Sequence, residues 1–132
     1  MTEQQSWQIF FDEGRGFHKT VRSSVKRPHI FTPSIIQNIA AMAIEKYFMA
    51  IFMKNGLMPM NHTMTDFIAA SKLILTLKAE LIETLLYMDN LQQICSFDFF
   101  KITPPSEGDV VRFIKAVDDV AEIAEQELGI EQ

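Results

Sequence analysis

The amino-acid sequence predicts an all-α protein, an antiparallel up-and-down bundle of four to five helices built as one domain over residues 1–132. Residues 39–50 are apolar on every helical face except at one Glu-Lys pair, so a helix there must be buried on all sides. Glycine and proline are scarce, at five each, and hydrophobic residues make up 48% of the chain, which is typical of a packed helical core. No segment shows the alternation of a half-buried strand.

The first predicted helix covers about residues 6–25, because core-type residues recur there every three or four positions. These positions are Trp7, Phe10, Gly14, Phe17, Val21 and Val25. Gly14 and Gly16 each cost the helix up to about 1 kcal/mol relative to alanine, which predicts that the helix backbone approaches a neighbour closely at these positions. The helix should end before Pro28, since the residue that precedes a proline disfavours helical geometry.

The second predicted helix has the clearest start and stop signals in the chain. Thr32 is placed to cap its N-terminus, and Pro33 suits the first helical position. Gly56 supplies the left-handed cap that ends it at about Lys54, and Pro59 prevents its continuation.

A third helix is expected to begin near Thr63, whose hydroxyl can cap it while Asp66 lies at the third helical position. Residues 67–94 contain neither Gly nor Pro and keep an apolar period near 3.5. Periodicity alone does not distinguish one long helix from two, but a compact bundle favours two helices with a break around residues 76–80.

The rest of the chain predicts a loop and one last helix. Residues 95–108 form the loop, in which Phe97, Phe99 and Phe100 are expected to fold back on the core. The last helix starts at Ser106 or Asp109, ends at about Leu128 and is stopped by Gly129. An acidic outer row follows along it at Asp118, Glu122 and Glu125.

A single cysteine, Cys95, excludes an internal disulfide and is interpreted as a buried, inert thiol. The first residues show no export signal, and Gln37, Asn38, Glu45 and Lys46 interrupt the one span apolar enough to suggest a membrane helix. We therefore expect a cytoplasmic protein with no membrane span and no cofactor.

The net charge of -5 hides an uneven distribution. Residues 1–66 carry seven Lys and Arg against five Asp and Glu, a net charge of +2, whereas residues 67–132 carry five against twelve, a net charge of -7. The basic residues Arg15, Lys19, Arg22 and Lys26, followed by Arg27, have the spacing of one helical stripe. Such a stripe can attract the phosphates of RNA or of a nucleotide. It can also be a plain solvent-exposed face, or it can dock on the acidic last helix of a second chain.

A family resemblance rests on residues 39–62. The series Ala40, Ala41, Ala43, Glu45, Lys46 and Ala50, followed by Gly56, Pro59 and His62, resembles the central signature of HEPN domains, the nucleotide-binding domains of higher eukaryotes and prokaryotes. An aromatic-led first helix and a long last helix after a proline-bearing loop agree with this family, so the resemblance covers nearly the whole chain.

The resemblance implies an antiparallel helical bundle that forms a homodimer, often in a toxin-antitoxin pair with a nucleotidyltransferase. Many members of the family are metal-independent ribonucleases whose Arg and His, four to six residues apart late in the bundle, meet across the dimer. This sequence departs from that pattern, because it has no Arg and no His between Leu81 and Val111. We therefore expect a dimeric interaction module, or one associated with a nucleotide or RNA, that lacks catalysis.

The alternative hypothesis is a metal-independent endoribonuclease toxin that uses Arg22 and His29, which are separated by six residues. A histidine could accept the proton of the attacking hydroxyl, and an arginine could stabilise the charge that develops on the phosphate. His62 is interpreted either as a capping or loop-packing residue or as a ligand contact. The three histidines lack metal-ligand spacing, so no metal site is predicted. Glu45 and Lys46 are expected to be a solvated gap in the buried helix or an ion pair at a dimer seam.

Overall fold

The computed structural model describes residues 3–97 and 105–130, together with the side chains of residues 6–91 and 105–130. These residues contain helices and connecting turns and no strand, so the predicted all-α bundle is confirmed. The helices are α1 (Glu3–Ser24), α2 (Pro33–Asn55), α3 (Met64–Ser71), α4 (Ala79–Phe97) and α5 (Glu107–Leu128).

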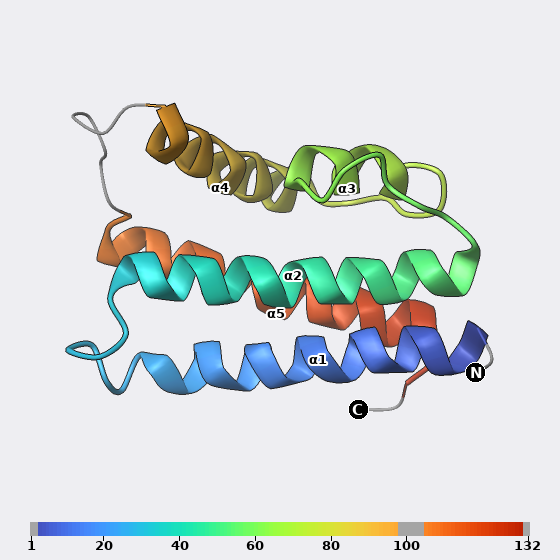
Figure 1. The fold of residues 1–132 in the computed structure, drawn as a ribbon, viewed down its shortest axis with the longest axis horizontal. Helices are drawn as coiled ribbons and strands as arrows, with labels where there is room; N and C mark the ends of the chain where they lie inside the picture. The colour runs from blue at the N-terminus through green and yellow to red at the C-terminus, as the bar shows by residue number, and fades with distance from the viewer. Residues whose placement is uncertain (1–2, 98–104, 131–132) are drawn as a thin grey trace.

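Helix α2 occupies the centre of the bundle (Figure 1). It packs along α1 on one side and along α5 behind, while α3 and α4 lie on the side of α2 that faces away from α1. The long helices α1, α2, α4 and α5 alternate in direction along the chain, as an up-and-down bundle requires. As a result, α2 and α5, which contact each other, run in the same direction.

The predicted helix ends are confirmed where a capping side chain or a glycine determines them. Thr32 accepts a hydrogen bond from the amide of Ile35 at the start of α2, and Gly56 ends that helix with φ 68°. Thr63 caps α3 through the amide of Asp66. At the start of α5, Ser106 and Asp109 form a reciprocal capping box, and Gly129 with φ 69° ends the helix.

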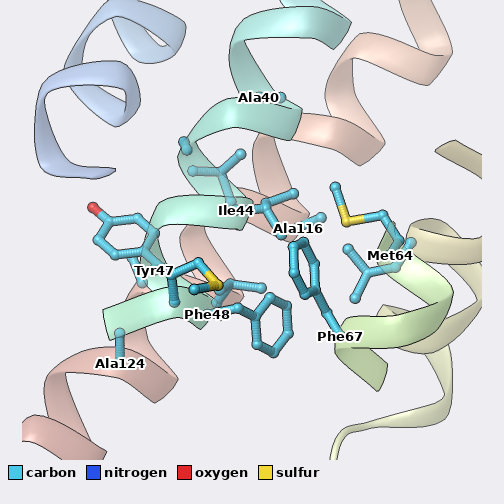
Figure 2. Packing of buried hydrophobic residues seen from close by; sticks show 14 of the residues in the cluster. Ala40, Ile44, Tyr47, Phe48, Met64, Phe67, Ala116 and Ala124 are labelled. Carbon is cyan, nitrogen blue, oxygen red and sulfur yellow. The ribbon is translucent and has the colours of Figure 1, made fainter. Parts of the chain in front are cut away.

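Aromatic side chains of α2 and α3 form the middle of the core. Phe48 of α2 stacks on Phe67 of α3 with ring centroids 5.6 Å apart, and Ala116 of α5 lies beside them (Figure 2). Ile44 and Phe48 are fully buried, as predicted. The prediction that residues 39–50 are buried on all sides is nevertheless wrong at Met42, which is 42% exposed.

Among the described residues, α2 is also the one helix long and apolar enough to cross a membrane. Its most apolar stretch is 61% buried against the rest of the bundle, which is the environment of a core helix in a helical bundle.

The predicted first helix needs two corrections. It ends at Ser24, so Val25 lies outside it and is exposed, and Phe11 is buried at the core instead. A Cβ atom on Gly14 would lie 3.0 Å from the Tyr47 ring, so the predicted close approach to a neighbour is confirmed there. The same prediction is wrong for Gly16, where a Cβ atom would meet nothing within 4 Å.

Residues 67–94 form two helices, as expected, but the break comes earlier than predicted. Helix α3 ends at Ser71, residues 72–78 connect it to α4, and Ala79 and Glu80 already belong to α4. The buried Ser71 hydroxyl donates to the carbonyl of Ile68, and the Ser71 carbonyl accepts from the amides of Ile74 and Leu75, which closes the turn. The predictions for Phe99 and Phe100, and for the side chains of Cys95 and Phe97, lie outside the described residues.

Candidate functional site

A groove of about 350 Å³ lies between α2, α3 and α4. We call it the motif groove, because three positions of the HEPN-like signature, Ala41, Glu45 and His62, line it. Its lining is formed by Asn38, Ala41, Met42 and Glu45 of α2, His62 just before α3, Met64 and Phe67 of α3, and Asp89 of α4.

Glu45 and His62, seventeen residues apart in the sequence, meet at this groove. His62 Nδ1 lies 2.5 Å from Glu45 Oε1, and the imidazole stands edge-on to Phe67 with ring centroids 6.1 Å apart. The carboxylate favours the tautomer that carries hydrogen on Nδ1, so the lone pair of Nε2 points away from Glu45. His62 is therefore held in one orientation by a contact that the sequence did not predict.

Asp89 is a buried carboxylate in the same lining, with only 8% of its surface exposed. It accepts hydrogen bonds from the amides of Met64 at 3.0 Å and Thr65 at 2.8 Å, and from the Thr65 hydroxyl at 2.9 Å. A residue of α4 thus holds the N-terminus of α3, where the helix dipole favours negative charge. The sequence analysis missed this residue, and its one sequence signal is an acidic residue within the apolar pattern of residues 67–94.

Two further signature positions, Lys46 and Gly56, serve the fold at separate places. Lys46 pairs with Glu13 of α1 at 3.2 Å and lies 5.3 Å from the centre of the Phe10 ring. Gly56 is the C-terminal cap of α2. Glu45 and Lys46 are both partly exposed, and each joins α2 to a different part of the chain.

A second polar cluster, the histidine network, joins α1, α2 and α5. His18 Nδ1 lies 3.0 Å from the Tyr47 hydroxyl, and His18 Nε2 lies 2.6 Å from Asp118 Oδ1. Arg22 contacts both oxygens of the same carboxylate at 3.2 Å. A neutral imidazole fits these contacts, with Tyr47 donating to Nδ1 and Nε2 donating to Asp118.

The network shifts the pKa values of its members. Burial raises the pKa of Tyr47 to about 12, with a further contribution from the negative charge of Glu125. Partial burial alone would raise the pKa of Asp118, but the hydrogen bonds from Arg22 and His18 outweigh it and lower that pKa below its ordinary value. Asp118 therefore stays ionised, and both ring nitrogens of His18 are occupied.

The predicted cationic stripe is distributed over two segments. Arg15, Lys19 and Arg22 lie on α1, but Lys26 and Arg27 fall beyond its last residue. Arg22 is held by Asp118, a member of the predicted acidic outer row, so part of the charge asymmetry is neutralised within one chain. Glu122 and Glu125 line the same hollow as Arg22, which brings further negative charge to this face.

Arg22 and His29, the candidate catalytic pair, lie on different segments. His29 is exposed in the turn after α1, in which the carbonyl of Arg27 accepts from the amides of Ile30 and Phe31. The histidine that shares a carboxylate with Arg22 is His18, which lies four residues earlier on the same helix face. That spacing was the available sequence signal for the network.

An apolar groove of about 380 Å³ lies where the turn between α1 and α2 meets the start of α5, and we call it the turn groove. Val25, Phe31, Ile36, Val110 and Val111 are among its lining residues. Val25 is 51% exposed and Val111 is 69% exposed, and Ile30 in the turn and Ile35 in the first turn of α2 are exposed as well.

Comparison with family models, with curated proteins and with solved structures finds no match for this chain. Within the part of the chain that the structure describes, no three His, Cys, Asp or Glu side chains group closely enough to hold a metal ion.

Proposed function

We propose that the protein is a HEPN-like module that acts by binding another protein chain and forms a homodimer through the turn groove. The observation that carries this proposal is the exposed apolar surface around that groove, formed by Val25, Ile30 and Val111. Contiguous exposed apolar surface on a soluble domain commonly marks an interaction site.

The charges at the groove favour a second copy of this chain as the occupant. Lys26 and Arg27 are exposed beside the turn groove, and Glu107 at the start of α5 is exposed in its lining. In a two-fold dimer through this groove, the basic turn of each copy can face the acidic start of α5 in the other. Such a dimer agrees with the homodimer implied by the HEPN resemblance.

Analytical ultracentrifugation over a wide range of protein concentration tests this proposal. We expect a reversible dimer that Val111→Glu weakens at least about tenfold, because a carboxylate must then be desolvated in an apolar contact. The matched control is Leu73→Glu, at an exposed leucine in the connection between α3 and α4, which should leave the affinity unchanged. A wild-type chain that stays monomeric throughout would refute the homodimer.

The resemblance also suggests a nucleotidyltransferase partner in a toxin-antitoxin pair. A reading frame for such an enzyme beside the one for this protein would support that assignment. Copurification of the two chains, lost in Val111→Glu and retained in Leu73→Glu, would place the partner at the turn groove.

Absence of catalysis is part of the proposal, and the placement of the candidate pair supports it. Arg22 is held by Asp118 of α5, whereas His29 lies in the turn after α1 and not beside Arg22. The competing ribonuclease would use Arg22 and His29. Incubation of RNA with the wild type and with Arg22→Ala and His29→Ala decides between them, because cleavage that either substitution abolishes would overturn our proposal.

Association with RNA or a nucleotide is the second candidate function. It is favoured by the exposure of Arg15, Lys19, Lys26 and Arg27, although the acidic residues of α5 near Arg22 oppose it. Phosphate binding of this kind must weaken steeply with salt. A Lys19→Ala and Arg27→Ala double variant should bind labelled single-stranded RNA more weakly and with a smaller salt dependence than the wild type.

A further inference from the structure

Two of the chain's eight methionines line the motif groove. In the sequence, Met58, Met60, His62 and Met64 occupy every second position of a seven-residue stretch. Met42 of α2 joins Met64 and His62 in the lining of the groove. Two thioethers and one imidazole, from α2 and from around the start of α3, therefore line one hollow of about 350 Å³.

Thioether sulfur is a neutral, soft ligand that selects Cu(I) among the common biological metals, whereas Zn(II) prefers thiolate, imidazole and carboxylate. A site of two methionines and one histidine offers little to Zn(II) or Mg(II). It suits a soft monovalent cation, and the flexible methionine side chains can adjust to the ion.

The contact between Glu45 and His62 is the arrangement found behind metal-binding histidines. Such histidines commonly donate the ring N–H that faces away from the metal to a carboxylate, which fixes the tautomer and makes the other nitrogen a better ligand. Here Nδ1 lies against Glu45, so Nε2 carries the lone pair. This observation is independent of the methionines and indicates the same kind of ligand.

The charge of the groove favours a cation as well. Glu45 and Asp89 are both in its lining, and none of the described side chains that line it is a Lys or Arg. Asp89 already accepts three hydrogen bonds at the start of α3, so it contributes negative potential and is not needed as a ligand.

We propose that the motif groove binds Cu(I), with His62 Nε2 and the sulfur atoms of Met42 and Met64 as ligands and Glu45 orienting His62. Met60, which is exposed two residues before His62, lies outside the groove lining and is not assigned as a ligand. This site is separate from the turn groove and does not depend on the proposed dimer.

Titration with Ag(I), a redox-stable substitute for Cu(I), tests the assignment. The Cys95 thiolate would itself bind Ag(I), so each variant also carries Cys95→Ser. We expect Met42→Leu, Met64→Leu and His62→Gln each to weaken Ag(I) binding by about tenfold or more, and Glu45→Gln to weaken it by about tenfold. The matched control is Met53→Leu, near the end of α2 and outside the groove lining, which should leave the affinity unchanged.

A second measurement covers the case in which Met64→Leu, at a nearly buried position, perturbs folding. In the chain with its full set of methionines, the ε-methyl NMR signals of Met42 and Met64 should shift on addition of one equivalent of Ag(I), and that of Met53 should not. Competition with a chromogenic Cu(I) chelator should then give the same order of affinities among the variants.

Three results would overturn the proposal. Affinity for Ag(I) could be unchanged in Met42→Leu and Met64→Leu, Zn(II) could bind the groove as tightly as Ag(I), or all methionine methyl signals could shift equally. Any of these would show that the thioethers do not form a selective site.

Discussion

The group formed by α1, α2 and α5 differs from the pair α3 and α4 in how its helices are held together. Within the three-helix group, helices pack along much of their length and a chain of polar contacts runs from Tyr47 through His18 and Asp118 to Arg22. The pair α3 and α4 lies on the far side of α2 from α1, joined by residues 72–78, and Asp89 holds the start of α3 (Figure 1).

We infer from this difference that α1, α2 and α5 contribute most of the stability, whereas the boundary between α2 and the α3–α4 pair is suited to binding a ligand. All five helices contribute to one continuous core, but the contacts of α2 with α1 and α5 are the most extensive, so these three helices should open together. The α3–α4 pair has less surface in contact with the rest, and the motif groove lies at its boundary with α2. Ligand sites in proteins are commonly found where packing is less complete, as it is here.

The largest expected loss of stability comes from changing Phe48, a residue of α2 that also contacts α3. Phe48 is fully buried and stacks on Phe52 of α2 and Phe67 of α3. Phe48→Ala should lower the free energy of unfolding by about 3–5 kcal/mol, through lost burial and the cavity that remains. Urea unfolding measures this change. Leu73→Ala, at a 75% exposed side chain, should stay within about 0.5 kcal/mol of wild type, and a similar small loss for Phe48→Ala would contradict the shared core.

The helix ends could be predicted from the sequence because their signals are local. Thr32, Gly56, Ser106 and Gly129 act within four residues of themselves, and each determines the end of a helix as expected. The length of the connection after Ser71 was less predictable, since a buried hydroxyl ended α3 within an unbroken apolar pattern.

The sites depend on residues distant in the sequence, which single-sequence patterns do not pair. His18 contacts Asp118 across 100 positions, and Asp89 contacts Thr65 across 24. Glu45 and His62 were singled out by the resemblance, but their contact requires the path of the chain after Gly56. Polar partners of this kind follow from which helix faces meet, and that is decided by packing of the whole bundle.

The next largest effect is a pH dependence of the free energy of unfolding, which arises within the three-helix group from Tyr47. The folded state holds the pKa of Tyr47 at about 12, above the value of about 10 in an unfolded chain. Folding therefore favours the neutral phenol, and the stabilisation is complete below pH 10 and is lost as the pH rises toward 12. We expect the free energy of unfolding to fall by about 2–3 kcal/mol across this range, from this group alone.

Tyr47→Phe removes the group responsible and should flatten the pH dependence between pH 10 and pH 12. At neutral pH it should cost about 1 kcal/mol for the lost hydrogen bond to His18. Tyr87→Phe is the comparison outside the histidine network. Burial and the hydrogen bond to Asp109 raise the pKa of Tyr87 too, but less than that of Tyr47, so this substitution should remove a smaller share of the pH dependence. If Tyr47→Phe and Tyr87→Phe lose the same share of the pH dependence, burial of Tyr47 is not its cause.

Asp89→Asn tests the α3–α4 pair alone. The substitution removes the charge and one acceptor that serve the first amides of α3, so we expect a loss of about 1–3 kcal/mol. Hydrogen exchange should accelerate in α3 more than in α1 or α5. Asp66→Asn is the comparison at the same helix end, because the carboxylate of Asp66 makes only an exposed contact with Thr63. It should lower the free energy of unfolding by less than Asp89→Asn does. Uniform acceleration in all helices would show that the two regions open as one unit.

The smallest effect compares two glycines two residues apart on α1. Alanine favours a helix by up to about 1 kcal/mol over glycine, and a methyl group at Gly16 would meet nothing within 4 Å, so Gly16→Ala should stabilise the protein by that amount. At Gly14 the same methyl group would lie 3.0 Å from the ring of Tyr47, which is buried and held by His18 and so has little room to move. Gly14→Ala should therefore be destabilising, by about 1 kcal/mol or more. Thermal unfolding of the two variants distinguishes these signs, and stabilisation by Gly14→Ala would mean that the contact between α1 and α2 is looser than its distances indicate.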